Sequence, residues 1–140
     1  MLRTGDQYRE SIRDGRNVWV DGKKVDDVPN HPTFKPIVDI RARIYDMAHE
    51  KKFSEKLSYI DENTNERNCI GSKLPKTQKD WSAKREAIKT IMYEIGAVVT
   101  RVGDETAGEM WSLFDGTDIL NEVDPRFGKN IATHIKKVLE

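Results

Sequence analysis

One arginine is the strongest candidate for chemistry in this sequence. Arg101 follows the apolar turn 96–99 and precedes a Gly103-Asp104 pair that breaks a helix. A charge delivered at the end of an apolar segment suits a binding site, because irregular segments commonly carry functional side chains. The same guanidinium could instead hydrogen-bond the last carbonyls of its own helix and act as a cap. The residues alone leave both roles open.

The other residues of catalytic or metal-binding type show no useful spacing. His31, His49 and His134 are far apart in the chain. We interpret His31 as a turn residue and the other two as solvated side chains on polar faces. Cys69 has no activating base nearby, which predicts a small, buried or half-buried packing residue. The acidic run 61–66 lacks the glycine and the final glutamate of a calcium loop, so we predict a solvated loop. We predict no metal site and assign no catalytic residue.

Length and composition limit the class of protein. At 140 residues the chain is most simply one domain, spanning residues 1–140. Lys plus Arg equals Asp plus Glu at 24 each, so no net charge attracts nucleic acid or an anionic membrane. The single cysteine excludes a disulfide framework or an all-cysteine metal site within the chain. No apolar run resembles a signal peptide or a membrane span. We therefore expect a soluble, cytoplasmic protein.

A long helix from Thr77 to about residue 102 organises the elements that must position Arg101. Thr77 with Asp80 resembles a capping box, and Pro75 prevents an earlier start. The apolar residues of this segment recur at helical spacing: Trp81, Ile88, Ile91, Met92, Ile95, Val98, Val99 and Val102. Charges crowd its first half and are absent from residues 96–99, so we expect the helix to become more buried toward its end.

Upstream of this helix the sequence predicts two helices and a hairpin. Thr4 and Gln7 form a capping-box pattern before a short helix at residues 5–14. A hairpin at residues 17–28 turns at Asp21-Gly22 and must lean on other elements, because an isolated hairpin is marginally stable. We expect Thr33 to cap a helix that runs to about residue 49.

The remaining segments give weaker or shorter patterns. Residues 51–76 contain two short strand candidates, at 57–60 and 69–70. After Gly103-Asp104 we expect a helix that ends at Asp115-Gly116, then a short turn capped by Thr117 or Asp118. A last helix follows Asp124-Pro125, an N-cap with proline in the first turn. The fold class is mainly α, with about five helices and one hairpin.

Several short motifs, taken together and in order, resemble one enzyme family. They are Arg3-Thr4-Gly5-Asp6-Gln7-Tyr8, Asp14-Gly15-Arg16, His31-Pro32-Thr33-Phe34, Tyr45-Asp46, Pro75-Lys76-Thr77 with Asp80, and the stretch from Asn121 to Phe127. Their order and spacing are similar to the N-terminus of the oxygenase component of 4-hydroxyphenylacetate 3-monooxygenase and its relatives. Each motif is weak alone, but the series extends over nearly the whole chain.

The resemblance implies an acyl-CoA-dehydrogenase-like architecture and a flavin-dependent activity. In that family a helical N-terminal domain precedes a central β domain and a C-terminal helical bundle that forms a homotetramer. The hydroxylases use reduced FAD, supplied by a separate flavin reductase, to insert oxygen into a phenol. The resemblance therefore implies that this chain is the N-terminal part of a three-domain enzyme or a split subunit. We expect the chain alone to be inactive and not to bind FAD tightly, because it also lacks a Gly-rich phosphate loop.

The resemblance also assigns the candidate site. In the hydroxylases the break after the long helix reads Arg-Thr-Pro-Asp-Tyr, and its arginine and tyrosine hold the phenolic oxygen. Here the stretch begins with Arg101, and Glu105 replaces the tyrosine. Arg101 and Glu105 are therefore the candidate substrate-binding residues. The change to Glu105 puts a phenol substrate in doubt.

Two alternatives remain open at this point. The family's other branch contains 4-hydroxybutyryl-CoA dehydratase with vinylacetyl-CoA isomerase activity, which needs two cysteines here for an iron–sulfur cluster. The sequence has Thr100 and Asp104 in that neighbourhood, which disfavours this branch. The second alternative is a non-catalytic helical interaction module. We also expect apolar surface of the long and last helices to remain exposed on this chain.

Overall fold

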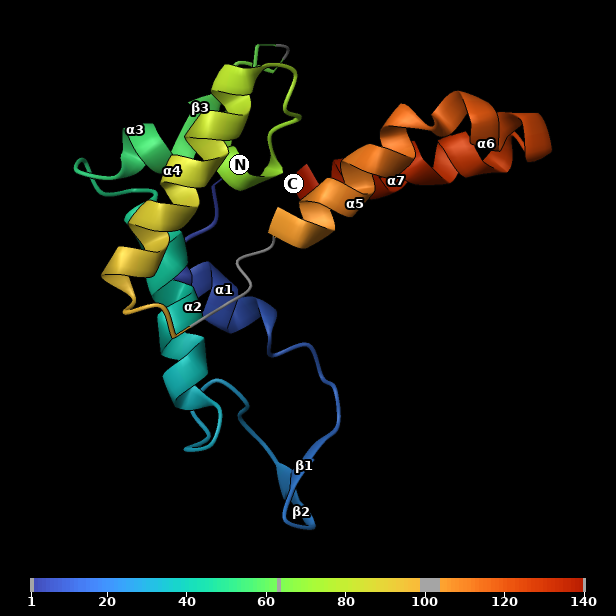
Figure 1. Cartoon of the computed structure of the whole chain (residues 1–140). Coiled ribbons are helices and arrows are strands. Elements are labelled where there is room, and N and C mark those ends of the chain that lie inside the picture. Colours follow the sequence, from blue (N-terminus) through green and yellow to red (C-terminus); the bar gives the residue numbers. More distant parts are fainter. Residues whose placement is uncertain (1, 63, 99–103, 140) are drawn as a thin grey trace.

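The computed structural model describes residues 2–62, 64–98 and 104–139, with side chains in these ranges except those of residues 104–106 and 139. Seven α-helices and two small antiparallel hairpins lie in these ranges. Helices α1–α4 and the second hairpin form one lobe, and α5–α7 extend from it as a second lobe (Figure 1). The mainly helical fold class is thus confirmed, while the predictions of about five helices and one hairpin were too low.

The first helix, α1 (Gly5–Ser11), begins at the expected capping box. The backbone N–H of Gln7 donates to Thr4 Oγ1 at 3.2 Å, and Gln7 Oε1 accepts from the Thr4 N–H at 2.8 Å. The helix is shorter than residues 5–14, because its C-cap is Ile12.

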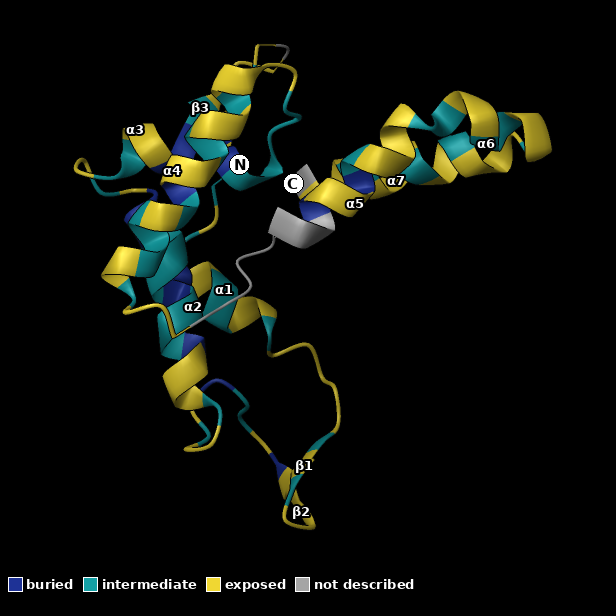
Figure 2. Cartoon of the chain, viewed as in Figure 1, coloured by how far each residue is buried: buried dark blue, intermediate teal, exposed yellow. Residues whose placement is uncertain are grey.

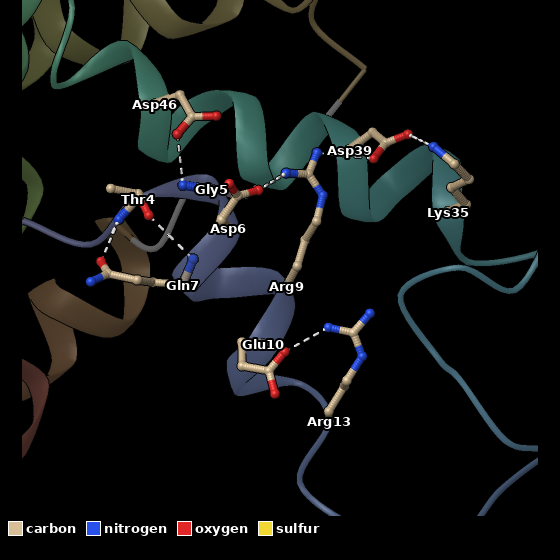
Figure 3. Close-up of polar contacts among 10 residues, drawn as sticks. All are labelled: Thr4, Gly5, Asp6, Gln7, Arg9, Glu10, Arg13, Lys35, Asp39 and Asp46. Atoms are coloured by element: carbon tan, nitrogen blue, oxygen red, sulfur yellow. Dashed lines mark hydrogen bonds and ion pairs between the residues drawn. The ribbon is translucent and has the colours of Figure 1, made fainter.

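Helix α2 (Lys35–Met47) lies against α1, and Figure 3 shows two polar contacts that join them. The Gly5 N–H donates to Asp46 Oδ1 at 2.7 Å, and Arg9 Nη2 lies 3.1 Å from Asp39 Oδ1. The predicted Thr33 cap was wrong. The N-cap is Phe34, without a side-chain hydrogen bond, and the Thr33 N–H donates to His31 Nδ1 at 3.3 Å.

The first hairpin pairs β1 (Val18–Val20) with β2 (Lys23–Val25), as predicted. Asp21 and Gly22 have φ of 50° and 74°, the left-handed conformations that a tight two-residue turn requires. The hairpin projects away from the helices (Figure 1), and Trp19 is 62% exposed. The supporting contact that we expected is therefore not seen at Trp19.

The two weaker strand candidates pair with each other. Helix α3 (Ser54–Leu57) leads into β3 (Ser58–Ile60), which pairs with β4 (Arg67–Cys69), and a 3-10 turn η1 (Ile70–Ser72) follows. The strands were placed within one residue or two, but their pairing was not predicted. In the loop between them the Thr64 N–H donates to Asp61 Oδ1 at 3.1 Å.

A small core joins the end of α2 to α3, η1 and α4. Its buried members are Met47, Ala48, Leu57, Ile70 and Ala87. Other buried hydrophobic residues lie outside this cluster: Val25, Val38, Ala42, Ala107 and Met110. Exposed residues cover most of α5–α7 (Figure 2). Much of the apolar surface of the chain therefore remains outside this core.

The organising helix, α4 (Gln78–Glu94), begins as predicted but ends early. The Ala97 N–H donates to Met92 O at 2.9 Å, and Gly96 and Ala97 have φ of 64° and 55°. This left-handed ending is a Schellman-type C-cap, so the expected continuation to residue 102 was wrong. The expected burial was also wrong: Ala87 is 3% exposed, whereas Tyr93 is 80% and Val98 60% exposed. The exposed apolar surface that we predicted is present.

The second lobe contains α5 (Asp104–Asp115), α6 (Thr117–Val123) and α7 (Arg126–Leu139), and α7 packs back against α5. Asp124 Oδ1 accepts from the Arg126 N–H at 2.8 Å, which agrees with the predicted N-cap. The N-cap of α6 is Gly116 rather than Thr117 or Asp118. In the described part of the chain, no helix is long and apolar enough to span a membrane.

Candidate functional site

An open cleft of about 1190 Å³ lies where the two lobes meet. Residues of α2, η1, the η1–α4 loop and α4 line one side, and residues of α5 and α7 line the other. Most of the lining is apolar, and four aromatic side chains contribute: Tyr45, Trp81, Trp111 and Phe114. Such a surface suits an apolar binding partner.

The loop that borders the cleft is fixed by one carboxylate at the start of α4. Asp80 Oδ2 accepts from the N–H groups of Lys76 and Thr77 at 3.1 and 2.9 Å, and from Thr77 Oγ1 at 2.9 Å. Asp80 Oδ1 accepts from Lys73 Nζ at 2.6 Å. The Lys73 ammonium, and then the Thr77 hydrogen bonds, lower the pKa of the Asp80 carboxyl well below its usual value. The capping box predicted from Thr77 and Asp80 is thus also an anchor for the cleft.

The two lobes are joined at the cleft by a tryptophan. Trp111 Nε1 of α5 donates to the carbonyl oxygen of Ser72 in η1 at 3.2 Å. The Trp111 ring meets Phe114 edge-to-face, with ring centroids 5.6 Å apart. Lys84 of α4 also contacts η1, donating from Nζ to the Gly71 carbonyl oxygen at 2.5 Å. These bonds hold α4 and α5 on either side of η1.

Charge is unevenly distributed over the cleft. Six cationic residues line it, from both lobes: Arg3, Arg41, Lys76, Lys84, Arg85 and Lys137. The only acidic residue of the lining, within the described part of the chain, is Asp115. Because the chain as a whole is neutral, this face concentrates positive potential.

The end of α4 is attached to α2 by a second charged group. Arg43 Nη2 of α2 lies 2.5 Å from Oε1 of Glu94, the last residue of α4. Arg43 also forms an ion pair with Glu50. The hydrogen bond to Glu50, and then the one to Glu94, raise the pKa of the Arg43 guanidinium. Lys52 Nζ lies 4.2 Å from the ring centroid of Phe53 beside them. Both ends of α4 are therefore anchored by charged hydrogen bonds.

The sequence candidates fall mostly outside this geometry. Arg101 and the side chain of Glu105 lie outside the described residues, so both assignments stay predictions. His49 and His134 are exposed, as predicted, and His49 Nε2 lies 3.2 Å from the Arg3 carbonyl oxygen. Cys69 is exposed on β4 rather than buried, so that prediction was wrong. The cleft brings Cys69 together with none of the histidines.

The cleft itself was not predicted, although two signals pointed to its parts. The helix predicted to end at Asp115-Gly116 contains Trp111, and the predicted Thr77 capping box contains Asp80. Among the described residues no group of His, Cys, Asp and Glu could hold a metal ion. The cleft can bind apolar and acidic groups, and its described residues present no nucleophile paired with a base.

Comparison with known proteins identifies the family. Residues 4–140 match the family described as 4-hydroxyphenylacetate 3-hydroxylase N terminal. The chain belongs to this family. It is 35% identical over 105 residues to 2,4,6-trichlorophenol monooxygenase of Cupriavidus pinatubonensis (strain JMP 134 / LMG 1197), covering 74% of this chain and 20% of that protein. The family resemblance found in the sequence is confirmed.

Solved structures agree with this assignment. The oxygenase component (HpaB) of 4-hydroxyphenylacetate 3-monooxygenase, complexed with FAD and 4-hydroxyphenylacetate, superimposes with a TM-score of 0.85 and 27% identity. The match covers 98% of this chain and 28% of the HpaB chain. A 4-hydroxybutyryl-CoA dehydratase from N. maritimus has a TM-score of 0.80 at 21% identity, covers 99% of this chain and 27% of that chain, and shows the fold alone. The chain thus spans under a third of the relatives it matches.

Proposed function

We propose that this chain is the N-terminal helical domain of the oxygenase component of a phenol-type monooxygenase that uses reduced FAD. The observation that supports this most is the superposition of almost the entire chain on HpaB, whose structure holds FAD and a phenol. A flavin reductase as partner, a central β domain, a C-terminal helical domain and a homotetramer belong to the same proposal.

The sequence of this chain offers no dedicated loop for the diphosphate of FAD. The chain also spans only 28% of the HpaB chain, whose structure is complexed with FAD. We therefore assign FAD binding to the other domains of the oxygenase. In this proposal the present chain contributes to holding the phenol.

Arg101 is the residue that we assign to the phenolic oxygen. The structure fixes α4 up to Glu94 and begins α5 at Asp104, and the sequence places Arg101 between these helices. A guanidinium can stabilise an oxyanion through two parallel N–H donors. Glu105 replaces the tyrosine that holds this oxygen in the hydroxylases, so a guanidinium next to a carboxylate would favour a polar head group different from theirs.

The dehydratase branch is not supported by the cysteine content. Its fold is shared, but this chain has one cysteine, and Cys69 lies on β4, outside the helical stretch that would supply thiolates. A non-catalytic interaction module would keep the fold and lose the flavin.

Flavin binding tests the proposal against the interaction module. We would purify the chain with its native downstream sequence and the 140-residue chain alone, and titrate each with FAD reduced anaerobically by dithionite. We expect spectral changes in the anaerobic titration with the longer protein only, and phenol hydroxylation by that protein once O2 and a phenol are added. A sub-micromolar FAD affinity of the 140-residue chain, or no flavin binding by the longer protein, would contradict the proposal.

Arg101→Ala tests the site assignment in the longer protein. We expect kcat/KM to fall by about 10²-fold, the scale of losing one oxyanion donor, with little change in the free energy of unfolding. Arg101→Lys should restore only part of the loss, because an ammonium does not reproduce the planar fork of a guanidinium. An unfolded Arg101→Ala domain with normal kinetics in the surviving enzyme would identify Arg101 as a helix cap.

A further inference from the structure

The cleft between the lobes combines two properties that a surface facing only water does not need. Its walls carry exposed large apolar residues: Trp81 is 59%, Phe114 47% and Val138 42% exposed. Contiguous apolar surface of this kind commonly marks an interface. Its lining also carries six cationic residues and one acidic residue in a neutral chain. A complementary partner would therefore be apolar in its centre and acidic at its edges.

The size of the cleft favours a helix over a small molecule. Small-ligand pockets usually measure ~300–1,000 Å³ and are well enclosed, whereas this cleft holds about 1190 Å³ and is open. A helix about 10 Å wide that rises about 1.5 Å per residue fills a comparable volume with roughly three turns.

The walls of the cleft are already arranged to receive a helix. α4 and α5 lie on either side of η1, joined to it by the Lys84 and Trp111 hydrogen bonds at 2.5 and 3.2 Å. The floor between them is therefore fixed before any partner binds, which reduces the entropic cost of docking.

We propose that this cleft docks an amphipathic helix with an apolar stripe flanked by Asp and Glu, supplied by the rest of the same oxygenase. This rests on the proposed function, in which a chain spanning 28% of HpaB works with further domains. A second copy of the chain is the poorer occupant, because a two-fold contact through this face would set its cations against the same cations.

Lysine labelling provides the first test. The acetylation rates of Lys76 and Lys137 would be measured in the 140-residue chain and in the longer protein. Each rate would be divided by the rate of the same lysine in the protein unfolded in urea. We expect labelling of both lysines to be slower in the longer protein by about tenfold or more, as for groups that react only after local opening. Equal rates in the two proteins would overturn the proposal. Protection of the 140-residue chain that grows with its concentration would identify a second copy as the occupant and also overturn it.

Charge reversal provides the second test. In the longer protein, Arg41→Glu with Arg85→Glu should lower Tm more at low salt than at high salt, because the lost attractions are screened by ions. Lys23→Glu with Lys24→Glu, on the projecting hairpin, makes the same change of charge outside the cleft and should leave Tm nearly unchanged. Equal effects of cleft and hairpin variants would contradict the proposal. If the lysines of the longer protein are protected from acetylation but the protein hydroxylates no phenol, the docking helix is supported and the proposed function is rejected. If the lysines are unprotected and the protein hydroxylates a phenol, the proposed function is supported and the docking helix is rejected.

Discussion

The contact between Gly5 and Asp46 leads to a prediction whose sign can be worked out from the structure. Gly5 is the buried first residue of α1, and its N–H donates to Asp46 Oδ1 at 2.7 Å (Figure 3). A Cβ added at Gly5 would lie 2.5 Å from Asp46 Oδ2 and 2.8 Å from the Ala42 carbonyl oxygen. The Asp46 side chain can rotate away only by giving up the hydrogen bond, and the Ala42 backbone belongs to α2 and cannot move alone.

Gly5→Ala should therefore destabilise the chain. Overpacking costs about 1–3 kcal/mol, and weakening a charge-assisted hydrogen bond adds about 1 kcal/mol or more. The smaller entropy of the unfolded alanine chain offsets about 0.4–1 kcal/mol. The net loss is about 1–3 kcal/mol, and an unfolding entropy of about 2.1 cal/mol/K per residue converts it to a fall in Tm of roughly 3–10 °C for a chain of this length.

Gly108→Ala is the matched control. Gly108 lies inside α5, and a Cβ there would meet nothing within 4 Å. Alanine should stabilise this helix by about 0.5–1 kcal/mol. Urea unfolding followed by circular dichroism would measure both variants, and hydrogen exchange in residues 4–12 would show whether α1 opens locally. If Gly5→Ala is as stable as wild type or gains as much as Gly108→Ala, the packing argument is wrong.

Three further predictions concern the anchors of the cleft. Thr77→Ala should lower the free energy of unfolding by about 1 kcal/mol in urea titrations, the usual cost of losing a helix N-cap. The pKa of Asp80 is lower in the folded chain than its ordinary value of 3.8, so its contribution to stability is complete above pH 3.8 and is lost as the pH falls below it. Asp80→Asn should therefore make the free energy of unfolding less dependent on pH between 5 and 2 in the same assay. An unchanged pH dependence would count against the anchor. Trp111→Phe removes the donor to Ser72. Hydrogen exchange in α5–α7 should become about 2- to 10-fold faster, the equivalent of about 0.5–1.5 kcal/mol, while exchange in α1–α2 stays unchanged. Equal acceleration in both regions would show a global rather than a local role.

Local chemistry could be predicted from the sequence, and contacts between distant residues could not. The capping boxes at Thr4 and Thr77 and the turn at Asp21 each depend on neighbours within four residues, so their residue types suffice. The Gly5–Asp46 and Trp111–Ser72 hydrogen bonds join residues 41 and 39 positions apart. No local pattern specifies such pairs, and so the cleft that the Trp111–Ser72 contact borders was missed.

The ending of α4 shows a different kind of failure. Gly96 is a local C-cap signal, but the apolar residues on both sides of it favoured a longer helix. Helical periodicity identifies which face is apolar and does not say whether another element covers that face. Tyr93 and Val98 lie at this uncovered end. Arg101 and Glu105 remain predictions from the sequence and its family.

The anchoring of α4 connects the cleft to the proposed phenol site. At its start, Asp80 holds the loop that borders the cleft, and at its end, Arg43 holds Glu94. Between these anchors the helix packs its Ala87 into the core that also contains Met47 of α2 and Ile70 of η1. The sequence places Arg101 seven residues beyond Glu94. A helix docked in the cleft, as we propose, would therefore contact the same helix that ends at Glu94.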